Sequence, residues 1–129
     1  MTTSEAITAG KYVALTTFRK DGTPVPTPVW FALDGSRVVV QTPAGTGKLK
    51  RLRRDTRVVI APCDMRGRVP AGAPEQAGTA EIVTDAAEAT RLQGLLRRRY
   101  GFMYTLAHAI IRPRGKDAAP DVMLRVTLD

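Results

Sequence analysis

Two Asp-Gly pairs between short β-rich segments constrain the fold of this chain more than any other feature. Asp21-Gly22 follows the segment 12–18, and Asp34-Gly35 separates the segment 25–33 from the segment 37–42. Asp-Gly pairs accept the positive φ angles that tight hairpin turns require, and β-branched and aromatic residues flank both pairs. We therefore predict two successive β-hairpins within the first third of the chain.

The returning strand 25–33 is interrupted on one side by prolines. Pro24, Pro26 and Pro28 have no backbone N–H to donate to a neighbouring strand. Such a strand either runs at a sheet edge or crosses a site where its free carbonyls meet a ligand. We favour ligand contact, because Thr27 and Trp30 add a hydroxyl and a flat apolar face.

The remaining elements follow from periodicity and capping. We expect a short helix from Ser4 to about Gly10, a basic helix 48–54, a strand 57–62 covered on both faces, a loop 65–76, a strand 77–84, a helix 86–99 with Asp85 and Glu88 as capping pair, an apolar helix 102–111, a polar loop 114–120 and a strand 122–128. About six strands with two or three helices predict a mainly β fold, an antiparallel barrel with attached helices, in a single domain 1–129.

Composition excludes several function classes. Cys63 is the only cysteine and His108 the only histidine, so no internal disulfide and no His/Cys zinc site can form. The longest apolar run, 106–111, is far shorter than the roughly 20 residues that a membrane span needs, and Met1–Gly10 lacks the apolar core of a signal peptide. We expect a soluble, cytoplasmic protein without a metal, whose chemistry comes from a bound cofactor.

The charge of the chain indicates an anionic partner. The formal net charge is +8, and the cations concentrate in one segment: Lys48, Lys50, Arg51, Arg53, Arg54 and Arg57 lie within ten residues that contain only one acid, Asp55. A solvated basic helix face is the alternative interpretation.

The segment 43–48, Pro-Ala-Gly-Thr-Gly-Lys, precedes this basic helix. It is no P-loop, because Leu49 stands where a magnesium-binding Ser or Thr is needed and Thr42 stands where the first glycine belongs. A dinucleotide fingerprint fails as well, since Lys50 replaces the third glycine. A turn of small residues that exposes N–H groups before a basic helix can still coordinate phosphate oxygens.

At this level of detail the chain resembles a known family. The segments 12–19, 21–24, 27–31, 47–54 and 59–64 are similar to the flavin/deazaflavin oxidoreductase branch of the pyridoxamine 5'-phosphate oxidase-like split barrels. The resemblance implies a homodimeric split β-barrel of antiparallel, Greek-key type that binds FMN or coenzyme F420 in a groove at the dimer interface. The Ala-Pro-Cys-Asp end of the segment 59–64 favours F420.

The resemblance also assigns cofactor contacts. It implies that Thr27, Pro28, Val29 and Trp30 line the tricyclic ring, that Gln41 and Thr42 meet the ring edge or ribityl chain, that Thr46, Lys48, Lys50 and Arg51 hold the phosphate, and that Arg53, Arg54 and Arg57 meet the anionic polyglutamate tail of F420. No catalytic side chain is identified. Tyr100, Tyr104 or a water is favoured over His108 as a proton donor.

The resulting hypothesis is an F420H2-dependent reductase that transfers a hydride to a small conjugated or quinone-like molecule. Alternatives are an FMN-dependent oxidoreductase of the same fold, a non-catalytic F420 carrier and a nucleic-acid-binding module. Only 5% of residues are aromatic, and no RNA- or DNA-binding motif occurs, so we expect no nucleic acid partner. The C-terminal segment 122–129 lacks the Arg and His pair that holds pyridoxine phosphate in the oxidases, so pyridoxal chemistry is not expected.

Overall fold

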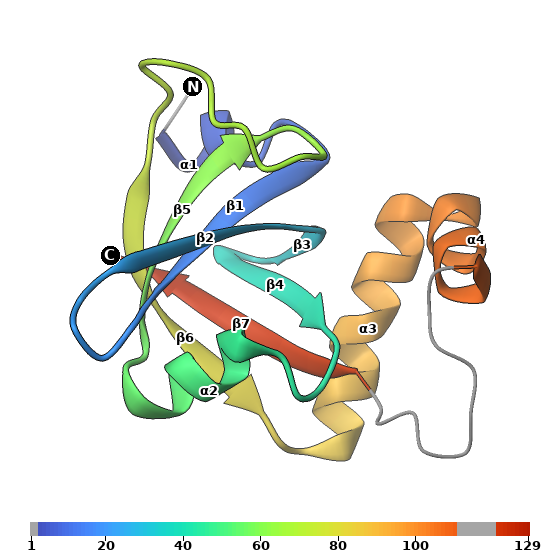
Figure 1. Ribbon diagram of the computed structural model, residues 1–129. Helices are drawn as coiled ribbons and strands as arrows, with labels where there is room; N and C mark the ends of the chain where they lie inside the picture. Colours follow the sequence, from blue (N-terminus) through green and yellow to red (C-terminus); the bar gives the residue numbers. More distant parts are fainter. Residues whose placement is uncertain (1–2, 111–120) are drawn as a thin grey trace.

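The computed structural model describes residues 3–110 and 121–129, and its seven strands form one antiparallel sheet (Figure 1). The strands are β1 (Tyr12–Phe18), β2 (Pro24–Val29), β3 (Phe31–Asp34), β4 (Arg37–Thr42), β5 (Arg57–Cys63), β6 (Gln76–Val83) and β7 (Val122–Leu128); the helices are α1 (Thr3–Ile7), α2 (Gly47–Arg54), α3 (Ala86–Tyr100) and α4 (Phe102–Ile110). This confirms the predicted mainly β, antiparallel fold. The expected loop 114–120 lies outside the described residues.

The sheet closes on itself at Trp30. The strand order is β2-β1-β5-β6-β7-β4-β3, so β2 and β3 are the two edges of the sheet, although Trp30 alone separates them in the chain. In a flat seven-stranded sheet with about 4.8 Å between neighbours, the edges would lie roughly 29 Å apart, which one residue cannot span. The sheet therefore curls until its edges meet, as in a split barrel. The prediction of a single strand over 25–33 was wrong, because the chain leaves one edge of the sheet at Val29 and enters the opposite edge at Phe31.

β2 is an edge strand whose prolines face outward. It pairs with β1 alone, and its side chains alternate between exposed prolines and more buried Val25, Thr27 and Val29. Backbone groups of successive residues in an antiparallel strand alternate between the partner strand and the free edge. Since proline has no N–H, the prolines occupy the outward set, and the free edge of β2 offers carbonyls without donors.

Two apolar clusters stabilise the fold. One fills the interior of the curled sheet and includes Phe31, Leu15, Ile60 and, from α2, Leu49 and Leu52. The other lies between the sheet and α3 and consists of Ala32, Val39, Val83, Leu92, Leu96, Tyr100, Tyr104 and Met123. α2 thus covers the interior of the barrel, whereas α3 covers the outer face of the sheet, with α4 packed against α3 (Figure 1).

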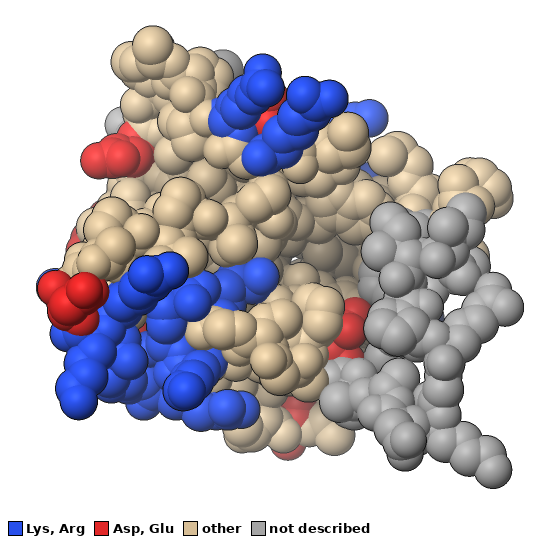
Figure 2. Space-filling view, viewed as in Figure 1, with Lys and Arg blue, Asp and Glu red and all other residues tan. Residues whose placement is uncertain are grey.

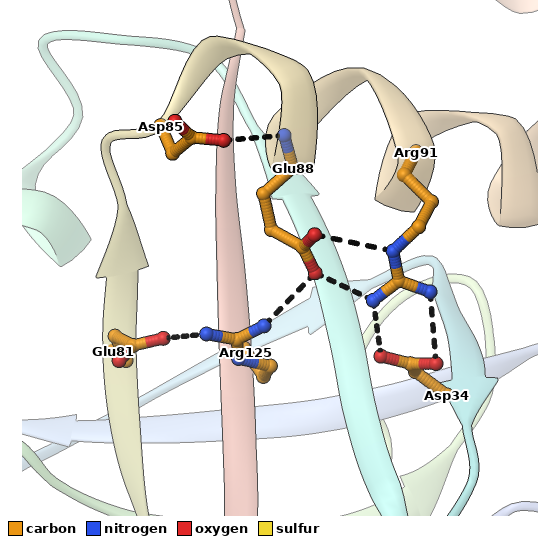
Figure 3. A network of polar contacts seen from close by, with 6 residues as sticks. All are labelled: Asp34, Glu81, Asp85, Glu88, Arg91 and Arg125. Atoms are coloured by element: carbon orange, nitrogen blue, oxygen red, sulfur yellow. Dashed lines mark hydrogen bonds and ion pairs between the residues drawn. The ribbon is translucent and has the colours of Figure 1, made fainter.

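A charged network joins α3 to the sheet (Figure 3). Arg91 binds Asp34 of β3 through two hydrogen bonds of 2.8 and 3.2 Å and also binds Glu88. Glu88 in turn accepts a 3.0 Å hydrogen bond from Arg125 of β7, which also binds Glu81 of β6. The helix is thereby tied directly to β3 and β7, and Arg125 extends the network to β6.

The N-terminus of α3 carries the predicted cap. The Asp85 carboxylate accepts a 2.8 Å hydrogen bond from the Glu88 N–H (Figure 3). The Glu88 side chain does not return to the backbone of Asp85 as a capping box would require, because Arg91 and Arg125 hold it.

None of the described helices has both the length and the apolar character of a membrane-crossing segment.

Candidate phosphate and cofactor site

The first turn of α2 has no side-chain cap. Thr46 is the N-cap residue, with extended backbone angles, but its hydroxyl caps no N–H of the helix. That hydroxyl oxygen is buried and has no hydrogen-bond partner in the structure. The N–H groups of the first turn therefore remain available to an acceptor outside the helix, and helix N-termini attract anions.

Arg51 folds back over this first turn. Its Nε donates a 2.6 Å hydrogen bond to Oγ1 of Thr17, which lies on β1. Its Nη1 lies 2.8 Å from the position that a Cβ atom would occupy at Gly47. The guanidinium is therefore fixed at one end by the barrel wall and rests against the start of the helix at the other.

Basic side chains without carboxylate partners surround the first turn of α2. Within the described part of the chain, no Asp or Glu forms an ion pair with Lys48, Arg51 or Arg54. Burial lowers the pKa of Lys48, and the nearby Arg51 lowers it further. Burial, then Arg19 and Arg54, lower the pKa of Arg51. Like charges held together in this way favour binding of an anion between them.

We call Lys48, Arg51, Arg54 and Arg19 the cation patch, because these side chains surround the first turn of α2. Figure 2 shows a continuous blue surface over α2 and the β1–β2 turn. Arg54 is held at this patch by a 2.9 Å hydrogen bond to the carbonyl of Phe18. Arg19, at the end of β1, contributes from the hairpin side. Sequence reasoning missed Arg19, because only the fold brings the hairpin next to α2.

Two buried threonines mark the same end of the barrel interior. Thr17 and Thr42 are 0% and 1% exposed and are the buried polar residues of the described chain. Each continues an apolar interior row, after Leu15 on β1 and after Val40 on β4. Thr17 is satisfied by Arg51, whereas Oγ1 of Thr42 has no partner. An unpaired buried hydroxyl costs free energy, so the Thr42 hydroxyl is suited to a polar ligand group.

The predicted ring-binding residues of β2 lie on the same curled wall. Thr27 donates a 3.2 Å hydrogen bond from its hydroxyl to the carbonyl of Leu15, so its side chain is committed to β1. Val29 is buried in the interior cluster, and Pro28 is exposed. Ligand contacts of Thr27 and Val29 would therefore use backbone groups, while Pro28 offers its ring and carbonyl at the free edge.

Trp30 and Gln41 lie on the side of the sheet that α3 and α4 cover. The Trp30 indole stacks on Tyr100 with ring centroids 4.2 Å apart and planes 9° from parallel. Gln41 accepts a 2.8 Å hydrogen bond from the Tyr104 hydroxyl and donates one of 2.6 Å to Asp121. Tyr100 covers one face of the indole, and the rings of Tyr12 and Tyr104 lie 6.5 and 6.4 Å from it between centroids, so a ligand can meet only the surface of the half-buried Trp30 that these rings leave open.

The two tyrosines considered as proton donors are hydrogen-bonded within the chain. The Tyr100 hydroxyl accepts from the N–H of Phe31 at 3.0 Å and lies 2.7 Å from the carbonyl of Lys11, to which it donates. The Tyr104 hydroxyl accepts from Gln93 at 3.0 Å. The side chain of His108 lies outside the described residues.

Three other basic residues of the segment 48–57 do not join the cation patch. Lys50 follows Lys48 by two positions, so the α-helix turns it about 200° away, and it is exposed. Arg53 is exposed as well. Arg57 forms an ion pair of 2.8 Å with Asp55, whose pKa falls to about 2 through hydrogen bonds from Arg57. Arg57 is thus already neutralised by an acid of the chain.

The donor set of the patch fits a phosphate group. It combines the guanidinium of Arg51, the ammonium of Lys48 and uncapped N–H groups, with the unpaired hydroxyls of Thr42 and Thr46 nearby. It offers no carboxylate cluster for a metal: the described residues contain no group of three His, Cys, Asp or Glu side chains that could hold one. A separate pocket of about 360 Å³, lined by Ala9, Gly10, Lys11, Arg99, Tyr100 and Met103, shares no residue with the patch.

Comparison with known proteins identifies relatives of this fold. The family model described as pyridoxamine 5'-phosphate oxidase matches residues 2–129. A solved structure of an F420 reductase is 25% identical, with a TM-score of 0.62 over 97% of this chain and 92% of that one. No curated protein matches the chain.

Two further solved structures share the fold at lower identity. A FAD-binding protein from Mesorhizobium loti is 17% identical, with a TM-score of 0.67 over 98% of this chain and 86% of that one. The heme storage protein HutZ from Vibrio cholerae is 16% identical, with a TM-score of 0.66 over 98% and 84%. Proteins named for three different ligands share this architecture, so the residues of the site have to decide which ligand it fits.

Proposed function

The chain belongs to the pyridoxamine 5'-phosphate oxidase family, and from this premise we propose that it is an F420H2-dependent reductase acting on a small conjugated or quinone-like molecule. The cation patch around Lys48 and Arg51 would hold the phosphate of the cofactor. The proline strand β2 would border the planar ring. The proposal includes a homodimer, whose second copy completes the cofactor groove, and a cytoplasmic location.

One observation carries this proposal: cations without acid partners converge on the first turn of α2, and the Thr46 hydroxyl at that turn and the Thr42 hydroxyl at the end of β4 are buried and unpaired. Structural arginines usually have acid or carbonyl partners, as Arg91 and Arg125 do in this chain. The guanidinium of Arg51 instead has only cations as charged neighbours. A phosphate would neutralise these charges and satisfy the orphaned hydroxyls at once.

Two features support F420 over FMN. Exposed Lys50 and Arg53 extend the positive surface beyond the point that one phosphate can neutralise, which suits the polyglutamate tail of F420. The F420 reductase at 25% identity also matches nearly the whole length of both chains. An FMN-dependent oxidoreductase is the alternative within the same site, and a non-catalytic F420 carrier is the alternative without turnover.

The role of the protein in such a reaction is positional. When bound, F420H2 supplies a hydride, and the chain has to orient the ring and exclude water from it. The outward carbonyls of β2 can accept hydrogen bonds from N–H groups of a ring at the sheet edge. The hydroxyls of Tyr100 and Tyr104 already make bonds within the chain, so we propose that water delivers any proton that the acceptor needs.

Binding and turnover can be measured separately. Purified protein is titrated with F420 and with FMN and followed by fluorescence, and F420H2 oxidation is then assayed with a panel of enones and quinones. We expect F420 to bind more tightly than FMN and at least one acceptor to be reduced. Tight binding of F420 without turnover on any acceptor would support the carrier, and failure to bind either cofactor would refute the proposal.

The two lysines of α2 provide a matched pair of variants. Lys48→Ala should weaken cofactor binding by roughly 1.5–3 kcal/mol, the range for losing a hydrogen bond to a charged group. Lys50→Ala removes the same charge from a different side of the helix and should cost less than about 1 kcal/mol, as an exposed charge does. Titration of both variants tests this order. Equal losses would contradict the placement of Lys48, and not Lys50, at the phosphate.

A further inference from the structure

We propose that Thr17 and Gly47 are positioning residues that hold the Arg51 guanidinium over the first turn of α2 and thereby make the site selective for a phosphate-bearing cofactor. Neither residue contacts the cofactor in this proposal. The inference rests on the proposed function, because it assigns the orientation of a group within the same site.

Thr17 supplies the anchor. It is fully buried and occupies a position on the interior row of β1 where Val13 and Leu15 precede it. A valine there would serve the apolar core equally well. The threonine instead places a hydroxyl 2.6 Å from Nε of Arg51. A hydrogen bond between a buried hydroxyl and a charged group is both strong and directional.

Gly47 supplies the space. A Cβ atom at this position would lie 2.8 Å from Nη1 of Arg51, closer than side chains pack, so the guanidinium would have to move. The backbone of Gly47 does not require a glycine otherwise, because it has no positive φ angle. Glycine is unfavourable in a helix relative to alanine. The feature that explains it in this structure is the close approach of Arg51.

Together these contacts determine which donors face the site. Arginine has five N–H donors, and the bond from Nε to Thr17 uses one of them. The N–H groups of Nη1 and Nη2 then remain available to a ligand, next to the uncapped N–H groups of α2. A phosphate bound there would meet guanidinium and helix N–H groups together, which is a geometry that a freely rotating arginine would not hold.

The test compares a phosphate-bearing cofactor with its phosphate-free counterpart. The pair is F420 and the same deazaflavin with an unphosphorylated ribityl chain, or FMN and riboflavin, whichever cofactor the wild-type protein binds more tightly. We expect Thr17→Val to reduce the preference for the phosphate-bearing member by about tenfold or more, the usual effect of losing one hydrogen bond to a charged group. Affinity for the phosphate-free member should not change.

Two variants on β1 serve as controls for Thr17→Val. Thr17→Ser keeps the hydroxyl and should retain the preference. Thr16→Val makes the same chemical change one residue away, on the opposite face of the strand, and should leave the preference at the wild-type value. Thermal unfolding of each variant verifies that it is folded.

Gly47→Ala separates positioning from stability. Alanine in place of glycine should leave the melting temperature at or above that of the wild type, yet the displaced Arg51 should reduce the phosphate preference as Thr17→Val does. A stable Gly47→Ala variant with wild-type preference, or a Thr17→Val variant with wild-type preference, would overturn the inference while leaving the proposed function intact. A wild-type protein that binds neither cofactor would remove the proposed function, and this inference with it.

Discussion

Thr42 is the residue at which stability and binding make opposite demands. Its hydroxyl is buried at 1% exposure without a hydrogen-bond partner, at the end of an interior row that begins with Val38 and Val40. In the free protein such a hydroxyl lowers stability relative to a methyl group of the same shape. In a cofactor complex it would be an acceptor or donor at a place where water is excluded.

Thr42→Val should therefore stabilise the free protein by about 1 kcal/mol, since it removes an unsatisfied buried hydroxyl. The same change should weaken cofactor binding, because the ligand loses a polar partner. Thermal unfolding and a fluorescence titration measure the two effects. Thr79→Val, at an exposed position on β6, is the control and should change neither. A lower melting temperature for Thr42→Val would mean that its hydroxyl has a partner in the free protein.

Sequence reasoning was able to find part of this site at the residue level. Lys48 and Arg51 lie three positions apart in a predicted helix, so a shared face was expected from spacing. The sequence pattern did not identify Thr17 as a site residue, because threonine and valine are equally compatible with an interior position of an alternating strand. The family resemblance grouped Lys50 with Lys48 at the phosphate, whereas two positions along an α-helix place the two side chains about 200° apart.

At the element level, turns and prolines predicted more than strand lengths did. The Asp-Gly pairs placed both hairpins, and Pro24, Pro26 and Pro28 indicated that β2 has one side without a neighbour. The break at Trp30 was not predictable from local pattern, since β-rich residues continue through it. It exists because the sheet closes, which depends on strands far apart in the chain.

Two glycines in neighbouring elements differ in what surrounds them. A Cβ atom at Gly78 of β6 would lie 2.6 Å from the backbone carbonyl oxygen of Thr127 in β7, a rigid neighbour. A Cβ atom at Gly94 of α3 would meet nothing closer than the guanidinium of Arg98 at 4.0 Å. The first glycine is required by the pairing of β6 with β7, and the second is not required by space.

Gly78→Ala should accordingly destabilise the protein by about 1–3 kcal/mol or more, as overpacking against backbone does. Gly94→Ala should stabilise it by about 0.5–1 kcal/mol, because alanine is the better helix residue. Chemical denaturation of both variants compares the same chemical change in two environments. Equal effects would contradict the close β6–β7 approach at Gly78.

At the scale of the whole molecule, charge is distributed unevenly. The net charge is +8; among the described residues, the cations at the first turn of α2 form no ion pair with an acid, whereas Arg91 of α3 and Arg125 of β7 do (Figures 2 and 3). Composition predicted the excess and its position near α2. It was not able to predict the network of Asp34, Glu88, Arg91 and Arg125, because these residues come from β3, α3 and β7 and meet only in the folded chain.

This network makes global stability depend on acid. Hydrogen bonds from Arg91 lower the pKa of both Asp34 and Glu88 below the ordinary values of 3.8 and 4.5. A carboxylate with a lower pKa in the folded state contributes stability above its unfolded pKa, and this contribution disappears as the pH falls through the folded pKa. Asp55, whose pKa falls to about 2, extends the pH range over which this stabilisation is lost to lower pH.

The melting temperature should therefore be nearly constant from neutral pH to about pH 5 and should fall between about pH 4.5 and pH 2. The double variant Asp34→Asn with Glu88→Gln imitates the protonated network, so it should melt below the wild type at pH 7 and approach it near pH 2. Glu75→Gln, which neutralises one exposed acid, is the control and should follow the wild-type curve. If the double variant stays below the wild type by the same margin at every pH, lost packing rather than lost charge explains its effect, and the network does not hold α3 to the sheet through ion pairs.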